Sequence, residues 1–286
     1  MLSPSAVPLL LRLAAAAVTG TAALLALRRF HRDEAVAAIR RDIRDALLLL
    51  DDGNRPPVVL VAGFRAHGKS SFINTACRAL AAESGPLLLR AETAPPGPGG
   101  ATLERRIVRA AVAGGGCEEE EDDDDAAAVE MVDAPALPEP GRLTRADVEA
   151  ALAGGAGAPP PECVALVLRC GGPRKERHLA AKKLAEIATA IRERGLQFVV
   201  VLTQRKKIRS RRKAEELRRE IAFRARTDSV YLIENYTAGD ALNLESPWAA
   251  RNNFGTHFTA LTIVRQCIEF TKLRRRMRKE RENGRS

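Results

Sequence analysis

The chain has 286 residues, 45% of them hydrophobic, so it is long enough for one large domain or two small ones with a sizeable core. Its formal net charge of +10 favours anionic partners, namely nucleotides, nucleic acid or an anionic membrane surface. The five cysteines include no C-x-x-C pair and the four histidines lie far apart, which argues against a disulfide framework and against a zinc or histidine metal site.

The N-terminus is apolar. Residues 7–27, VPLLLRLAAAAVTGTAALLAL, have about the length of a bilayer-spanning helix. Arginines follow at 28, 29 and 32, and the positive-inside rule would leave the rest of the chain in the cytosol. We expect residues 1–32 to be a transmembrane anchor with a cytosol-facing domain. One alternative is a targeting segment, either an organelle transit peptide, which is typically poor in acidic residues as this segment is before Asp33, or a secretory signal. The other alternative is a buried helix.

Residues 33–54 predict an amphipathic connector helix. Apolar residues recur at spacings of three and four from Val36 to Leu50, and Asp51, Asp52 and Gly53 end the pattern. We expect this helix to pack on the domain that follows.

Residues 55–272 alternate between strand and helix patterns. The apolar run 58–62 is typical of a strand buried on both faces, and further strands are expected over 105–112, 127–132, 163–168, 197–203 and 229–234. Helices are expected over 70–82, 176–195, 213–224 and 257–279. This alternation predicts an α/β domain with a mostly parallel sheet.

Between the second and third predicted strands lies a strongly acidic segment. Residues 118–125 are eight consecutive carboxylates that follow three glycines and a cysteine. Adjacent like charges repel, and a calcium site would need spaced ligands and a glycine turn. We therefore expect residues 114–126 to form a solvated, flexible hairpin tip.

A phosphate-binding loop follows the first strand. Residues 63–70, GFRAHGKS, have the spacing of glycine, four residues, glycine, lysine and serine, between a predicted strand and a predicted helix. Backbone N–H groups of such a loop, together with the helix N-terminus, bind phosphate oxygens. The candidate nucleotide-binding residues are Gly63, Phe64, Arg65, Ala66, His67, Gly68, Lys69, Ser70 and Ser71. Lys69 would reach the β- and γ-phosphates as the main catalytic candidate, and Ser70 would bind Mg²⁺.

A carboxylate for the metal is expected beside this loop. Asp133 follows the third predicted strand, in the sequence DAPA. With these motifs the chain resembles the P-loop GTPases of the translation-factor-related class, whose second loop is Asp-x-x-Gly. The run GKSSFIN is also similar to dynamin-related, septin-like and immunity-related members. The resemblance spans roughly residues 56–272 and implies a three-layer P-loop NTPase (GTPase-like) fold that uses Mg²⁺ and GTP, or ATP.

The resemblance also assigns switch residues. Asp133 would bind Mg²⁺ through water, and Thr102, or else Thr93, would cap the ion. Ala136 stands where the family has a glycine that meets the γ-phosphate; alanine keeps the N–H but restricts the backbone.

The base-recognition motif is degenerate. Thr203 and Gln204 match the family's motif, whereas Lys206 stands at the position of its aspartate and cannot accept hydrogen bonds from guanine. After the last strand, Asn235 and Tyr236 are similar to a pair in interferon-induced forty-four-type GTPase-like proteins. Asn235 would contact a base edge or form a turn.

No glutamine stands in residues 133–141 to orient an attacking water. Arg65 could act as an arginine finger in cis or point to solvent, and His67 is expected to pack rather than carry protons. The sequence therefore predicts a magnesium–nucleotide-binding, GTPase-like protein of low hydrolytic activity, or a pseudo-GTPase scaffold without turnover.

Two basic segments remain. Residues 205–213 contain seven basic residues, and residues 273–286 form a basic C-terminal tail. Neither has interleaved aromatic residues, which disfavours nucleic acid and leaves an anionic membrane surface, or the acidic run 118–125, as the expected partner. The sequence does not identify a protein partner.

Overall fold

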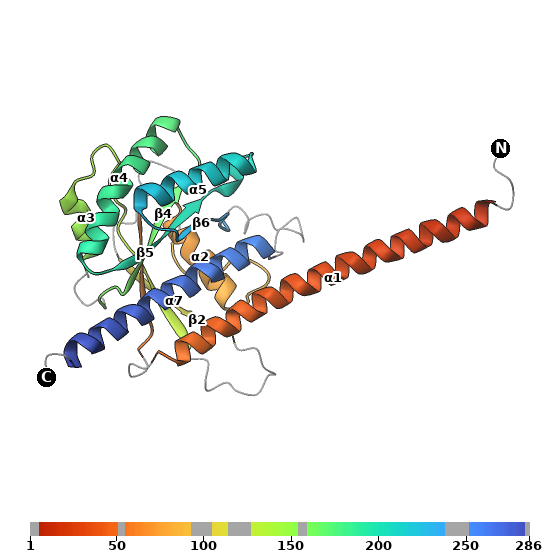
Figure 1. Cartoon of the computed structure of the whole chain (residues 1–286), viewed down its shortest axis with the longest axis horizontal. Coiled ribbons are helices and arrows are strands. Elements are labelled where there is room, and N and C mark those ends of the chain that lie inside the picture. The colour runs from red at the N-terminus through yellow and green to blue at the C-terminus, as the bar shows by residue number, and fades with distance from the viewer. Residues whose placement is uncertain are drawn as a thin grey trace.

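The computed structural model describes residues 6–50, 55–92, 105–113, 127–153, 159–237 and 252–283. A six-stranded sheet, ordered β2-β3-β1-β4-β5-β6, lies between two layers of helices (Figure 1). All neighbouring strands pair in parallel except β2 and β3, which are antiparallel. The predicted α/β class with a mostly parallel sheet is confirmed.

The strands lie close to their predicted positions. They are β1 (Val58–Gly63), β2 (Arg106–Ala111), β3 (Ala128–Asp133), β4 (Cys163–Arg169), β5 (Gln197–Thr203) and β6 (Val230–Leu232). The central strands β1 and β4 are buried along almost their whole length, which explains their unbroken apolar runs. The edge strand β2 alternates between exposed and buried residues, as expected for a strand with one solvated face.

Helices cover both faces of the sheet. They are α1 (Ala6–Leu48), α2 (Lys69–Leu80), α3 (Arg145–Leu152), α4 (Arg174–Glu193), the short 3-10 helix η1 (Arg205–Lys207), α5 (Arg211–Ala225) and α7 (Phe254–Asn283). One face carries α1, α2 and α7, and the other carries α3, α4 and α5 (Figure 1). Helix α3 was not predicted; Thr144 and Asp147 start it with a reciprocal capping box.

Helix α1 is continuous through both the segment expected to be an anchor and the one expected to be a connector. Its C-terminal part buries Ile43 and Leu47 against the core, whereas its N-terminal part projects away from the domain (Figure 1). Leu24, Leu25 and Phe30 are exposed on the projecting part. Within the described residues, no helix has an apolar stretch sufficient to cross a bilayer, so the transmembrane helix expected over residues 7–27 gains no support.

The segment expected to be a basic C-terminal tail is mostly part of α7, which continues to Asn283. Its Arg275 is buried and forms a two-pronged ion pair with Glu162, both N–O distances being 2.8 Å. Arg275 also donates to the carbonyl oxygen of Arg55 at 3.2 Å. This arginine therefore fixes α7 to the start of the domain and is not part of a basic surface. The acidic run 118–125 lies outside the described residues.

Candidate nucleotide-binding site

The phosphate loop connects β1 to α2 in a tight turn that needs glycine at both ends. A Cβ atom on Gly63 would lie 2.3 Å from the carbonyl oxygen of Val167 in β4, so no side chain fits there. Gly68 precedes α2 with a φ of 88°, in the left-handed region that favours glycine. Between them Ala66 is also left-handed, with a φ of 57°, although it is not glycine. The backbone thus curls around the N-terminus of α2.

Ser70 and Asp133 meet beside this loop. Strands β1 and β3 are parallel neighbours, and Val61 lies opposite Asp133. Asp133 therefore lies at the end of the sheet where the loop begins, two residues after Val61. The Ser70 hydroxyl donates to one carboxylate oxygen of Asp133 at 2.6 Å, and both residues are buried. The other carboxylate oxygen, Oδ1, is buried and has no hydrogen-bond partner among the described residues. The structure therefore brings together the two residues that the sequence assigned to a metal.

Burial shifts the two charged groups of the site in opposite directions. It raises the pKa of the Asp133 carboxyl, while the hydrogen bond from Ser70 and the positive charges of Lys69 and Arg106 act to lower it. Burial lowers the pKa of the Lys69 ammonium, and the charge of Asp133 opposes that shift. Burial thus disfavours the charged form of both groups, and a cation bound beside Asp133 or an anion bound beside Lys69 would favour it.

The donor set fits Mg²⁺. Hydroxyl and carboxylate oxygens are hard ligands of the kind this ion prefers, and the unpartnered Oδ1 of Asp133 offers a free lone pair. Among the described residues no group of three or more His, Cys, Asp or Glu side chains could hold a metal alone. Mg²⁺ usually keeps several waters and is bound by one or two protein oxygens together with substrate phosphates. Thr102 and its alternative Thr93 lie outside the described residues.

His67 holds the loop from below. Its ring is 2% exposed and lies edge-on to Phe64. Its Nδ1 accepts from the backbone N–H of Arg169 at 3.3 Å. Burial, followed by the charges of Arg169 and Lys69, lowers the pKa of His67 to about 3, so the ring is neutral near pH 7. These contacts give the side chain a packing role, while its backbone remains in the loop.

Thr203 and Asn235 also hold carbonyl groups of the loop. The Thr203 hydroxyl donates to the carbonyl oxygen of His67 at 2.8 Å, and the Asn235 amide donates to that of Gly68 at 3.2 Å. The Asn235 side-chain oxygen is buried without a partner in the described structure. The end of β5 and the segment that follows β6 thus contact the phosphate loop itself, whereas the sequence assigned Thr203 and Asn235 to recognition of a base. Gln204 follows in a left-handed conformation and lies against Gly171.

An acidic residue to which the sequence assigned no role lies beside Lys206, in the loop expected to recognise a base. The backbone N–H of Lys206 donates to a carboxylate oxygen of Glu234 at 2.6 Å. The lysine stands where a GTPase would have aspartate, so Glu234 brings a carboxylate to this loop from another strand end. Its position directly before Asn235 was the available signal.

The segment after Asp133 is tied to the phosphate loop. Leu137 is buried, pairs with Phe64 in a parallel bridge and donates its N–H to the carbonyl oxygen of Gly63 at 3.0 Å. Ala136, where the GTPases that the sequence resembles have glycine, is not among the residues with positive φ, so alanine is unstrained there. In contrast to these buried contacts, Arg65 is exposed on the loop.

Similarity to known proteins is found among solved structures alone. No family model matches the chain, and no curated protein matches it. Among solved structures, the crystal structure of a probable GTP-binding protein, engB, is similar over 74% of this chain and 98% of that chain, with 14% sequence identity and a TM-score of 0.38. At this identity and score, any functional conclusion depends on the geometry of the phosphate loop.

Proposed function

We propose that this chain is a GTPase-like P-loop protein that binds a magnesium complex of a nucleoside triphosphate and hydrolyses it slowly. The observation that supports this most directly is the 2.6 Å hydrogen bond between Ser70, at the start of α2, and Asp133, at the end of the neighbouring strand. Two oxygen ligands at this distance, directly beyond a glycine-bounded loop and a buried lysine, match the requirements of a magnesium–phosphate site.

Each group has a defined part in this proposal. The backbone N–H groups of residues 64–70 and the N-terminus of α2 bind the phosphates, and the Lys69 ammonium binds the β- and γ-phosphate oxygens. Ser70 and Asp133 would hold Mg²⁺, which when bound neutralises charge on the phosphates. Thr203 and Asn235 keep the loop carbonyls turned away from the ligand through the hydrogen bonds described above.

Slow turnover follows from what surrounds the site. Residues 133–141 contain no glutamine to orient water, and Leu137 fixes this segment to the phosphate loop. Arg65 and Ala66 are the exposed residues of the loop, and Arg65 is the one whose charge could reach the γ-phosphate. Base choice is left to Gln204, Glu234 and Asn235, so both GTP and ATP are candidate ligands.

The second candidate is a pseudo-GTPase scaffold. In this case bound nucleotide stabilises the domain and is not hydrolysed. The pairing of Leu137 with Phe64 favours it, because a segment held in this way is restrained from the loop rearrangement that a GTPase switch requires. The same pairing is compatible with tight nucleotide binding.

A binding and turnover experiment on the full chain separates these functions. Fluorescent GTP and ATP analogues are titrated with Mg²⁺ and with EDTA, and phosphate release is then followed. We expect binding that Mg²⁺ strengthens, loss of binding in Lys69→Ala, loss of the Mg²⁺ effect in Asp133→Asn, and no change in the exposed control Arg142→Ala. Release of phosphate that Arg65→Ala slows supports the enzyme, binding without release supports the scaffold, and absence of binding at millimolar nucleotide rejects both.

A further inference from the structure

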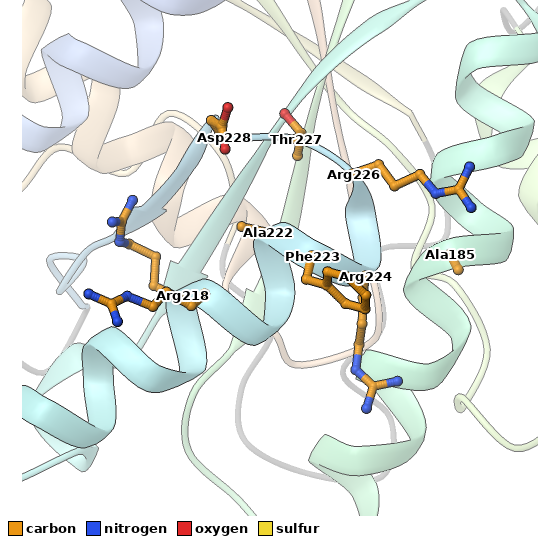
Figure 2. Close-up of a pocket in the computed structure, with 9 residues that line it drawn as sticks. Ala185, Arg218, Ala222, Phe223, Arg224, Arg226, Thr227 and Asp228 are labelled. Carbon is orange, nitrogen blue, oxygen red and sulfur yellow. The ribbon is translucent and has the colours of Figure 1, made fainter.

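An open cavity of about 800 Å³ lies between α4 and α5, on the other side of the sheet from α1 and α7. Figure 2 shows it with Ala185 of α4 on one side and the C-terminal half of α5 on the other. Four arginines line it, namely Arg218, Arg219, Arg224 and Arg226, around the ring of Phe223. We name these five residues the arginine cavity.

Phe223 is unusually exposed, at 85%. It points away from the buried face of α5, which consists of Ala214, Ile221 and Ala225. An aromatic ring surrounded by arginines has the residue composition of protein-binding hot spots. Aromatic and arginine side chains contribute most to the binding free energy when a partner excludes water from them.

The arginines are available for new partners. Arg218 and Arg219 share Glu215, and Arg224 pairs with Glu220, in pairs whose partners are 31–77% exposed. Exposed ion pairs of this kind contribute little to the stability of the fold, so the arginines can exchange these partners for others. Arg226 has no ion pair within the described part of the chain and extends toward α4 in Figure 2. Residues 205–226 around the cavity contain eleven Lys and Arg against three Glu.

The chain itself carries a matching polyanion. Residues 118–125 are eight consecutive carboxylates in the connection between β2 and β3. Five inter-strand steps of about 4.8 Å separate the edge strand β2 from the opposite edge strand β6. The edge of the sheet beside the cavity therefore lies roughly 24 Å from β2. Residues 118 and 125 are five and two residues from Ala113 and Ala127, and therefore reach at most about 18 Å and 7 Å. The run cannot place all its carboxylates on α5 of its own chain.

We infer that the arginine cavity binds the acidic run 118–125 of a second copy of this chain. Because β2 and β3, which flank the acidic run in sequence, lie at the opposite edge of the sheet from the cavity, the contact is head-to-tail and leaves one free cavity and one free acidic run at the ends of each assembly. Such an interface propagates into open chains unless its rotation closes a ring. It requires no nucleotide and is independent of the function proposed above.

Analytical ultracentrifugation of the full chain tests this inference. We expect concentration-dependent association at about 0.1 M salt that disappears at about 1 M salt, where the screening length falls from about 10 Å to about 3 Å. Neutralising residues 118–125 to Gln and Asn, or the double reversal Arg219→Glu with Arg226→Glu, should weaken association by more than about tenfold. The control Arg142→Glu with Arg276→Glu changes the net charge equally at exposed sites elsewhere and should associate as the wild type does.

Mixing the two defective proteins gives the sharper result. The neutralised protein keeps its cavity and the reversed protein keeps its acidic run, so the mixture retains one working interface and should form a species of two chains, each of 30.9 kDa, and nothing larger. A monomeric wild type at low salt, association that survives about 1 M salt, as contacts through the apolar part of α1 would, or a mixture that stays monomeric would each overturn the inference. So would single-stranded RNA binding at the cavity without self-association.

Discussion

At the scale of single residues, Ala66 is the strained position of the phosphate loop. Its φ of 57° lies in the left-handed region, which costs an alanine about 1 kcal/mol or more. Ala66→Gly should therefore leave the free energy of unfolding unchanged or raise it by up to about 1 kcal/mol. The matched control Ala185→Gly, at an exposed site inside α4, should lower it by about 1 kcal/mol. Urea unfolding measures both, and equal losses in the two variants would contradict the strain.

Two buried histidines predict acid sensitivity. Burial lowers the pKa of His67 to about 3 and that of His257 to about 4, below the ordinary value of about 6.5 that applies in the unfolded chain. The unfolded state therefore binds more protons, and the stability that neutral histidines provide is complete above about pH 6.5 and falls as the pH drops toward those values. The slope is about 1.4 kcal/mol per pH unit for each histidine.

The variant His67→Gln with His257→Gln isolates this effect. Between about pH 6.5 and pH 5, its unfolding free energy should vary less with pH than that of the wild type, because most carboxylates stay ionised in that range. Urea midpoints across the range measure the difference. Parallel curves for the two proteins would show that neither histidine is the source.

The candidate site is only partly predictable from sequence. The loop residues and Asp133 follow from a motif with fixed spacing, since a strand, a glycine turn and a helix define its geometry locally. Glu234 and Leu137 could not be found in that way. Glu234 contacts Lys206, and Leu137 contacts Gly63. Each contact joins segments that are distant in sequence, and only the order of the strands brings them together.

At the scale of elements, the ion pair between the buried Arg275 of α7 and the partly buried Glu162 before β4 is two-pronged. Glu162 also accepts from the N–H of Val58 at 3.2 Å, so the pair joins α7 to the starts of two strands. Arg275→Ala leaves the mostly buried carboxylate of Glu162 without its ion pair and should lower the free energy of unfolding by about 3 kcal/mol, since the hydrogen bond from Val58 remains. Arg275→Lys should recover only part of this, because lysine cannot form the two-pronged contact.

The neighbouring Arg276 supplies the control. It is exposed, and Arg276→Ala should change the free energy of unfolding by less than about 0.5 kcal/mol. Chemical denaturation of the three variants tests the pair. Equal effects at positions 275 and 276 would show that the ion pair does not hold α7 in place.

At the scale of the whole molecule, the alternating pattern predicts the six strands and the α/β class of the fold, but not the order of the strands in the sheet. Parallel neighbours β1, β3 and β4 are joined through long connections, and the pattern does not specify which strands become neighbours. Helix α3 was missed because it has only eight residues, too few for a clear period. The continuity of α1 was missed because a change from apolar to amphipathic composition gives no backbone signal for a break.

The projecting part of α1 predicts separable roles for the N-terminus and the domain. Residues 17–34 are exposed, so deletion of residues 1–32 should leave the thermal unfolding temperature of the domain nearly unchanged. If this segment anchors or targets the protein, as the sequence suggests, the same deletion should change its subcellular fraction. Deletion of residues 284–286 is the control. An unchanged location would end the anchor and targeting hypotheses, and a lower unfolding temperature would show that the segment is part of the domain.

The position of α7 in the chain has a consequence for synthesis. Its Ala260, Leu261 and Val264 complete one face of the sheet, yet the helix starts 184 residues after Ser70, since 254 minus 70 is 184. At about 5–20 residues per second, a ribosome needs roughly 10–40 s to make that stretch. During this interval the nascent phosphate loop sits on a sheet with an uncovered apolar face, a state that attracts chaperones. A message truncated before residue 254 would therefore yield material for proteolysis rather than a smaller nucleotide-binding protein.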